Sequence, residues 1–208
     1  VWRLSFGADD AARWRRLAQG LSMPHTVARG PDGRIYVSEM NRILTLDPDA
    51  ADPAATVRTV IGDLPDNRLH DNRHPLSSFV FDGDGALLVN VGAPSDRCLD
   101  ARGRARTDAK GACAYSAATA QVRRHAYLGA GRWAEDSTVF ASGLRNSIAL
   151  VRHRSGTILQ GENSVDLTTP DHPYDEINVL RRGGHYGWPY CVDLTTPLPG
   201  WSAAQARC

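Results

Sequence analysis

Three residues of this sequence carry side chains whose chemistry suits a ligand-binding or catalytic pocket. His74 can take up a proton near neutral pH, and Arg145 with its neighbour Asn146 can donate several hydrogen bonds to a planar, oxygen-rich ligand. Each is weak evidence alone, because a single loop histidine is usually solvated or structural and an Arg-Asn pair often braces a turn. Their importance therefore depends on whether the fold brings them together.

An internal repeat indicates how the chain is organised. The segment LAQGLSMPHTVARGPDGRIYVSE (17–39) aligns without a gap with FASGLRNSIALVRHRSGTILQGE (140–162), and SSFVFDGDGALLVNVG (77–92) repeats the pattern between them. Each copy has a short apolar or alternating run, a two-residue turn rich in Gly and Asp, and a second apolar run. This pattern is typical of a β-hairpin, so hairpins are predicted near 26–39, 78–91 and 149–162.

The repeat length predicts an all-β fold of the β-propeller class. Further strands are expected at 1–4, 43–46, 57–61, 122–127 and 177–180, and only 9–18 has weak helical character. The turn glycines Gly33, Gly85 and Gly156 lie 52 and 71 residues apart, as expected for four-stranded blades. Residues 1–208 are therefore predicted to form a single incomplete propeller domain of three to four blades, truncated at both ends. A complete, open repeat array is the alternative.

The same alignment predicts a shared pocket. Counting back five residues from the aligned first-strand positions gives Ser22, His74 and Arg145 in successive repeats. Equivalent positions in successive blades lie at equivalent heights around the propeller axis. If the loop that leads into each innermost strand faces the central tunnel, His74, Arg145 and Asn146 converge on one pocket from adjacent blades.

Three segments resemble the soluble quinoprotein glucose and sorbosone dehydrogenases. GLRNSIAL resembles their G-x-R-N segment, and HPLSSFVFDGDGALLVNVG resembles their histidine followed by a hairpin. GENSVDLTTPDHPYDEINVLRRGGHYGWPYC resembles their E-x-G, D-E-I-N and G-x-Y-G-W-P block. The resemblance covers nearly the whole chain in the right order, and it fits best the branch of PQQ-dependent aldose sugar dehydrogenases.

The resemblance implies a six-bladed propeller that binds pyrroloquinoline quinone (PQQ) and Ca²⁺. Such an enzyme oxidises an aldose or related sugar by hydride transfer to PQQ and passes the electrons to a quinone or cytochrome acceptor. His74 matches the general base, and Arg145 and Asn146 match the residues that contact the quinone oxygens. Donors at that place stabilise the negative charge that develops during hydride transfer.

The calcium ligands implied by the resemblance depart from the family pattern. Where the family reads E-Q-G-P, this chain reads Glu162, Asn163, Ser164, Val165. Ligation by main-chain carbonyls tolerates such a change, so Ser164 and Val165 are candidate ligands and Glu162 is a further one. The family's later basic residues, which hold the carboxylates of PQQ, would lie beyond Cys208.

The composition and the cysteines limit the possible partners and the cellular compartment. Lys plus Arg number 24 against 23 for Asp plus Glu, which argues against a nucleic-acid partner, and no apolar run approaches the ~18 residues of a transmembrane segment. Cys98, Cys113, Cys191 and Cys208 lack C-x-x-C spacing and favour two disulfides, hence a periplasmic or secreted bacterial protein. The local pairing, first with second and third with fourth, is preferred among three. Four free thiols are the alternative.

Two other functions remain open from the sequence. A propeller could have kept the fold and lost the cofactor, which would make it a binding module. A metal-dependent propeller lactonase predicts acidic side chains that converge on the axis, whereas the three equivalent positions hold serine, histidine and arginine.

Overall fold

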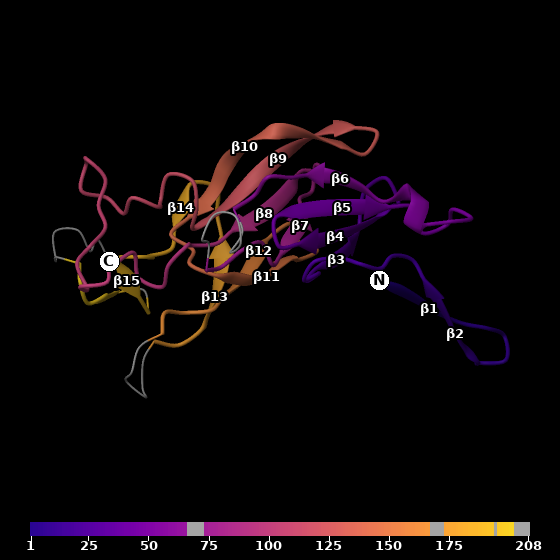
Figure 1. Ribbon diagram of the computed structural model, residues 1–208, viewed down its shortest axis with the longest axis horizontal. Coiled ribbons are helices and arrows are strands. Elements are labelled where there is room, and N and C mark those ends of the chain that lie inside the picture. Colours follow the sequence, from indigo (N-terminus) through magenta and orange to yellow (C-terminus); the bar gives the residue numbers. More distant parts are fainter. Residues whose placement is uncertain (66–72, 167–172, 194, 202–208) are drawn as a thin grey trace.

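The computed structural model describes residues 1–65, 73–166, 173–193 and 195–201, and its regular structure is almost entirely β (Figure 1). The first sheet has the order β3-β4-β5-β6 and is antiparallel. Its strands are β3 (Val27–Arg29), β4 (Ile35–Glu39), β5 (Arg42–Leu46) and β6 (Arg58–Ile61). One turn of 3-10 helix, η1 (Ala54–Thr56), connects β5 and β6.

The second and third sheets follow the first along the chain. The second has the order β14-β10-β9-β8-β7, in which only β14 is parallel to its neighbour. Its strands are β7 (Phe79–Phe81), β8 (Leu87–Val91), β9 (Gln121–Gly129), β10 (Arg132–Ser142) and β14 (Gly184–His185). The antiparallel third sheet contains β11 (Ser147–Arg152), β12 (Ile158–Glu162) and β13 (Glu176–Leu180). The expected four strands are thus present in the first sheet, with one more in the second and three described in the third.

Two small hairpins lie outside these sheets. One pairs β1 (Trp2–Phe6) with β2 (Ala12–Arg16) and projects from the body near the N-terminus (Figure 1). The other pairs β15 (Cys191–Val192) with β16 (Thr196–Pro197). Among the described residues, no helix has the length and apolar character needed to cross a membrane.

The sequence repeat is reproduced in the strand register. Val27 pairs with Val37, Phe79 with Val89 and Leu150 with Gln160, so each first-strand position faces the residue ten places later. The predicted strands at 1–4, 43–46, 57–61, 122–127 and 177–180 are also confirmed, as parts of β1, β5, β6, β9 and β13.

The hairpin turns are one residue longer than predicted. In the first hairpin the amide of Gly30 donates to the carbonyl of Arg34, which encloses three residues rather than two. The third loop residue is Gly33, Gly85 or Gly156, with φ of 80°, 81° and 90°. A three-residue hairpin needs a left-handed residue at this place, and glycine adopts it without steric cost.

The second sheet is packed between the other two. Every residue of β8 is buried. Leu87 and Val89 on one face join Tyr36 of the first sheet, whereas Leu88 on the other face joins Leu150 of the third sheet. Because side chains alternate along a strand, one buried strand supplies both contacts. Successive sheets packed face to face are the arrangement expected of neighbouring blades.

Hydroxyl side chains also link the first strands of successive sheets. Thr26 Oγ1 donates to the carbonyl of Ser77 (2.9 Å), and Ser78 Oγ, at the equivalent repeat position, donates to the carbonyl of Ser147 (2.8 Å). These bonds fix the relative positions of the loops that lead into β7 and β11, which carry His74 and Arg145.

The weak helical character of 9–18 does not produce a helix, and the segment contains β2 instead. A tight turn, in which Asp10 has φ 55° and its amide donates to the carbonyl of Gly7, reverses the chain and aligns 12–16 against β1. The backbone hydrogen bonds of this segment therefore go to β1, and Trp14 lies opposite Leu4. Cross-strand pairing overrides the weak helical propensity of a run this short.

Candidate active site

His74 lies in the loop before β7 and is held in one tautomer. Its side chain is buried, and Nδ1 lies 2.6 Å from the carbonyl oxygen of Ala93. Because a carbonyl only accepts hydrogen bonds, Nδ1 carries the proton of the neutral ring and Nε2 is its basic nitrogen. Burial, and next the charge of Arg145, lower the pKa of His74 to about 4. The imidazole is therefore neutral at physiological pH and able to accept a proton.

The dipeptide Gly92–Ala93, directly after β8, joins the histidine loop to the arginine loop. The amide of Ala93 donates to the carbonyl of Arg145 (2.7 Å), while its own carbonyl accepts from His74. A side chain at Gly92 would collide with the carbonyl oxygen of His74 and would lie 2.8 Å from its Cβ. The two predicted residues are thus brought to either side of one short backbone segment.

This close approach predicts that Gly92→Ala destabilises the protein. The added Cβ must push the His74 backbone away, and overpacking of this kind costs about 1–3 kcal/mol of unfolding free energy. Gly62→Ala is the matched control, because among the described residues a Cβ there would meet only Thr59 Cγ2, at 3.4 Å. Urea unfolding measures both variants, and equal losses of stability would contradict the proposed crowding.

Arg145 lies before β11 and is almost completely buried, with 2% of its surface exposed. Nη2 lies 2.8 Å from Asp96 Oδ1, and Nη1 donates to the carbonyl of Asn163 (2.9 Å). Its Nε is buried and has no hydrogen-bond partner among the described residues. An unsatisfied buried donor costs roughly 1–3 kcal/mol, so an acceptor atom placed at Nε would stabilise the arginine.

The side chains of Asn146 and Arg145 share a hydrogen-bond acceptor. Its Nδ2 donates to Asn163 Oδ1 (3.3 Å), which also accepts from Arg145 Nη1 (3.3 Å). The backbone amide of Asn146 donates to Glu162 Oε1 (2.8 Å). The structure therefore brings Arg145 and Asn146 into one hydrogen-bonded group at the start of β11.

Glu162 braces the arginine loop from the end of β12. Its carboxylate accepts from the Asn146 amide and from Gln160 Nε2 (2.5 Å), and burial raises its pKa to about 7. In the first repeat the aligned Glu39 accepts from the amide of Ser22 (2.6 Å), one position before the equivalent of Asn146. In both repeats the aligned glutamate thus accepts from a backbone amide of the loop before the first strand, which indicates a structural role for the Glu162 side chain.

A pocket opens beside this group between the third sheet and the segment before β15. Its lining includes Arg145, Glu162, Ser164, Val165 and Glu176. The amide of Ser164 is held by Asp175 Oδ1 (3.0 Å). The predicted calcium candidates thus share a pocket with the arginine, whereas His74 is not part of its lining and reaches the group through Ala93.

No cluster of three or more His, Cys, Asp or Glu side chains suited to a metal occurs in the described ranges. A cation in this pocket would therefore depend on main-chain oxygens or on groups supplied by a ligand. Carbonyl oxygens are accepted ligands of hard cations such as Ca²⁺.

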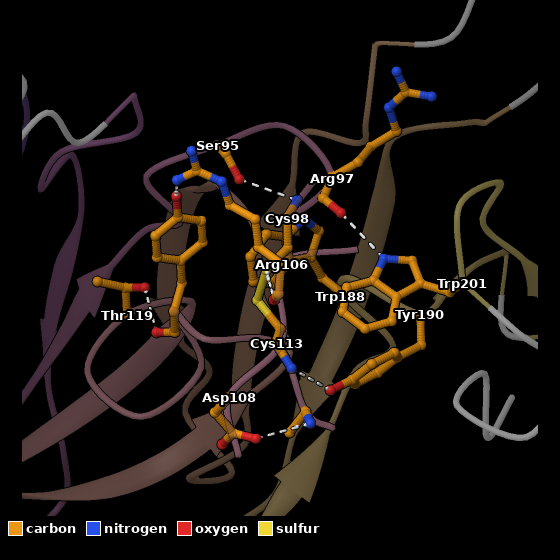
Figure 2. The surroundings of a disulfide bond; sticks show 12 residues. Ser95, Arg97, Cys98, Arg106, Asp108, Cys113, Thr119, Trp188, Tyr190 and Trp201 are labelled. Carbon is orange, nitrogen blue, oxygen red and sulfur yellow. Dashed lines mark hydrogen bonds between the residues drawn. A yellow bond between two sulfur atoms is a disulfide. The ribbon is translucent and has the colours of Figure 1, made fainter. Parts of the chain in front are cut away.

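The predicted disulfide Cys98–Cys113 is confirmed (Figure 2). It closes a loop that packs against the segment after β14: Trp201 Nε1 donates to the carbonyl of Arg97 (3.1 Å), and the amide of Cys113 donates to Tyr190 Oη (3.0 Å). The other predicted pair, Cys191 with Cys208, includes a residue outside the described ranges. The observed bond is consistent with an oxidising, extracytoplasmic compartment.

Sequence reasoning missed four members of this site, namely Gly92, Ala93, Asp96 and Asn163. The first two and Asn163 directly follow the second strand of a repeat hairpin, and that position was a signal available in the alignment. Asp96 lies just before the disulfide-closed loop, in a segment without a counterpart in the other repeats, so no pattern pointed to it.

Comparison with solved structures shows the fold. The chain resembles the holo form of the PQQ domain of pyranose dehydrogenase from Coprinopsis cinerea, with a TM-score of 0.66 and 20% identity over 96% of this chain and 51% of that one. It also resembles a calcium structure of a carbohydrate-active enzyme of family AA12 from Trichoderma reesei. There the TM-score is 0.63 and the identity 23%, over 99% of this chain and 53% of that one.

A glucose dehydrogenase structure matches as well, with a TM-score of 0.58 and 16% identity over 95% of this chain and 61% of that one. The chain thus spans about half the length of the first two structures. No curated protein matches it.

The resemblance found in the sequence is confirmed by the family comparison. The model of the TrAA12-like family matches residues 8–200, which is nearly the whole chain. The chain belongs to the TrAA12-like family.

Proposed function

We propose that this chain forms part of a PQQ-dependent sugar dehydrogenase that oxidises an aldose or related sugar. The observation that carries the proposal is a neutral, buried His74 joined through Ala93 to Arg145, whose buried Nε has no partner in the described part of the chain. A proton acceptor and an unsatisfied donor in loops joined by one short backbone segment suit the removal of a hydride and a proton from an alcohol carbon.

Each residue of the group has a task in this proposal. His74 Nε2 takes the proton of the sugar hydroxyl, and the Nδ1 bond to Ala93 keeps the ring in the tautomer that can do so. Arg145 Nε and the side-chain amide of Asn146 would donate to the quinone oxygens of PQQ. PQQ, when bound, supplies the two-electron acceptor.

Calcium is part of the same proposal. The main-chain carbonyls of Ser164 and Val165 would hold the ion, since both residues line the pocket that contains Arg145. Glu162 is the weaker candidate, because its carboxylate already accepts hydrogen bonds from Asn146 and Gln160.

We also propose that the whole protein is a six-bladed propeller. The third sheet supports this, because its outer face is apolar and exposed: Ile177 is 84% exposed, Val151 56% and Val179 50%. In the repeat alignment, Val151 corresponds to Ala28 and Val80, which pack against the next sheet in the first and second repeats. The exposed face is thus the one to which a fourth blade would be added.

Because this face is exposed, two matched lysine substitutions in the third sheet should differ in their effect on the unfolding free energy. Ile177→Lys should leave the unfolding free energy of the isolated chain within about 0.5 kcal/mol and should reduce its self-association. Leu150→Lys, which places the same charge on the buried face of the same sheet, should unfold the chain. Sedimentation and urea unfolding measure both, and severe destabilisation by Ile177→Lys would contradict an uncovered face.

We also propose a cellular location and an electron acceptor. The Cys98–Cys113 bond supports a periplasmic or secreted bacterial location. The electrons would pass to a quinone or a cytochrome.

Reconstitution tests the proposed function. The protein is mixed with PQQ and Ca²⁺, quinone binding is followed by absorbance, and reduction of a dye is measured with a panel of aldoses. Sugar-dependent dye reduction is the expected result. Failure to bind PQQ would overturn the proposal and favour the cofactor-free binding module, whereas quinone binding without turnover on any sugar would contradict the proposed substrate class.

A further inference from the structure

Asp96 faces Arg145 from a loop that is anchored on several sides. Its backbone carbonyl accepts from Trp188 Nε1 (2.8 Å), and Cys98, two residues later, forms the disulfide. The next carbonyl, that of Arg97, accepts from Trp201 (Figure 2). The Asp96 side chain is only 14% exposed. Its position is therefore set by the fold rather than by free rotation of a surface loop.

The guanidinium of Arg145 is clamped at both terminal nitrogens. Asp96 Oδ1 lies 2.8 Å from Nη2, and the carbonyl of Asn163 accepts from Nη1 at 2.9 Å. Asp166 is a second acidic neighbour, but it is 3.6 Å from Nη2 and 70% exposed. A planar group held at two corners has a fixed orientation, and here that orientation leaves Nε as the buried donor without a partner in the described part of the chain.

We propose that Asp96 is a positioning residue that neutralises Arg145 and fixes the direction in which its Nε presents a hydrogen bond to the ligand. The ligand's identity as a quinone rests on the proposed function, whereas the coupling between Asp96 and Arg145 does not. The disulfide then has a purpose at the site, because it anchors, two residues from Asp96, the segment that supplies the one mostly buried carboxylate within hydrogen-bond distance of the arginine among the described residues.

The first test measures the coupling without any cofactor. Asp96→Asn, Arg145→Gln and the double variant are unfolded in urea. Asp96→Asn should lower the midpoint by about 1–2 M, since it leaves a buried cation uncompensated. The double variant should be no less stable than Arg145→Gln alone, because no cation is then left. Strictly additive losses would show that the two residues do not act together and would overturn the proposal.

Asp166→Asn is the matched control in the same measurement. It removes an acidic side chain near the same nitrogen, but an exposed and more distant one. Its midpoint should change by less than about 0.3 M. A loss as large as that of Asp96→Asn would mean that bulk negative charge, and not the position of Asp96, stabilises the arginine.

The second test separates positioning from neutralisation. Asp96→Glu keeps the charge on a longer side chain, so it should keep most of the stability and lower the affinity for PQQ by about 10- to 100-fold, as expected when a bond to a charged donor is misdirected. The same change in an Arg145→Gln background should have no further effect on affinity. Unchanged PQQ affinity in Asp96→Glu would overturn the positioning role.

PQQ binding and the urea cycle distinguish an error in the proposed function from an error in the inference about Asp96. If the unaltered protein binds no PQQ, the proposed function is wrong, and the urea cycle still decides whether Asp96 holds Arg145. If PQQ binds and the cycle shows no coupling, the function stands and the inference about Asp96 is wrong.

Discussion

Replacing His74 with asparagine is expected to lower the turnover of the quinone-loaded enzyme by about 10²- to 10⁴-fold, the usual contribution of a general base. The asparagine Nδ2 can take the place of the histidine Nδ1 and still donate to the carbonyl of Ala93. The variant therefore keeps the link to the arginine loop and loses only the basic nitrogen. Steady-state dye reduction measures turnover, and a separate absorbance titration measures whether PQQ still binds.

His125→Asn is the matched control for this change. His125 lies on β9, is buried, and like His74 places Nδ1 near a backbone carbonyl, that of Ala134 at 2.9 Å. Its replacement should cost stability and leave turnover per folded molecule unchanged. If both variants lose turnover equally, or if His74→Asn retains it, His74 is not the base.

The same variant changes the response to acid. The pKa of His74 is lowered from 6.5 to about 4, first by burial and then by Arg145; Arg73 also lowers it, and Asp96 opposes the shift. Between these two values the unfolded chain binds more protons than the folded one. The stability contributed by the neutral histidine is thus complete above pH 6.5 and is lost as the pH falls toward 4. Urea unfolding across this range should show a smaller loss in His74→Asn, and activity limited by this base should persist below pH 6.

The repeat explains which parts of the fold could be predicted. The hairpin pattern depends on local alternation and on glycines that a left-handed turn position requires, so aligned positions such as Val27 and Leu150 occupy the same register in the structure. The strand within 9–18 was not predicted, because it depends on pairing with β1, and the weak helical character of the segment contains no information about that partner.

The site also contains residues that the sequence could predict and residues that it could not. His74, Arg145 and Asn146 have side chains with unusual chemistry at aligned positions, and the structure gathers their loops around Gly92–Ala93. Glycine and alanine there act through backbone groups and through the absence of a side chain, so residue type alone does not mark them. Ion pairing between distant segments, as for Asp96 and Arg145, is a property of the tertiary fold.

Removal of the Cys98–Cys113 disulfide by replacing both residues with alanine is expected to reduce the unfolding free energy by about 3 kcal/mol. The bond closes a loop with a sequence separation of 15 residues, and the chain-entropy model gives a value of this size for such a loop. Alanine is the appropriate replacement, because both cysteines are at most 2% exposed and a serine hydroxyl would be buried there. Urea unfolding under non-reducing conditions measures the loss.

Tyr190→Phe separates the covalent constraint from the packing around it. This change removes only the phenolic oxygen that accepts from the Cys113 amide (3.0 Å), and it should reduce the unfolding free energy by about 1 kcal/mol.

If replacing both cysteines with alanine also costs no more than this, the contacts of Trp188 and Trp201 alone hold the loop. If the pair costs the expected amount, it should weaken PQQ binding as Asp96→Glu does, because the segment that carries Asp96 then loses its anchor at Cys98 and gains freedom relative to Arg145. Full stability loss with unchanged PQQ affinity would show that the two indole bonds to the carbonyls of Asp96 and Arg97 suffice to keep the carboxylate in place.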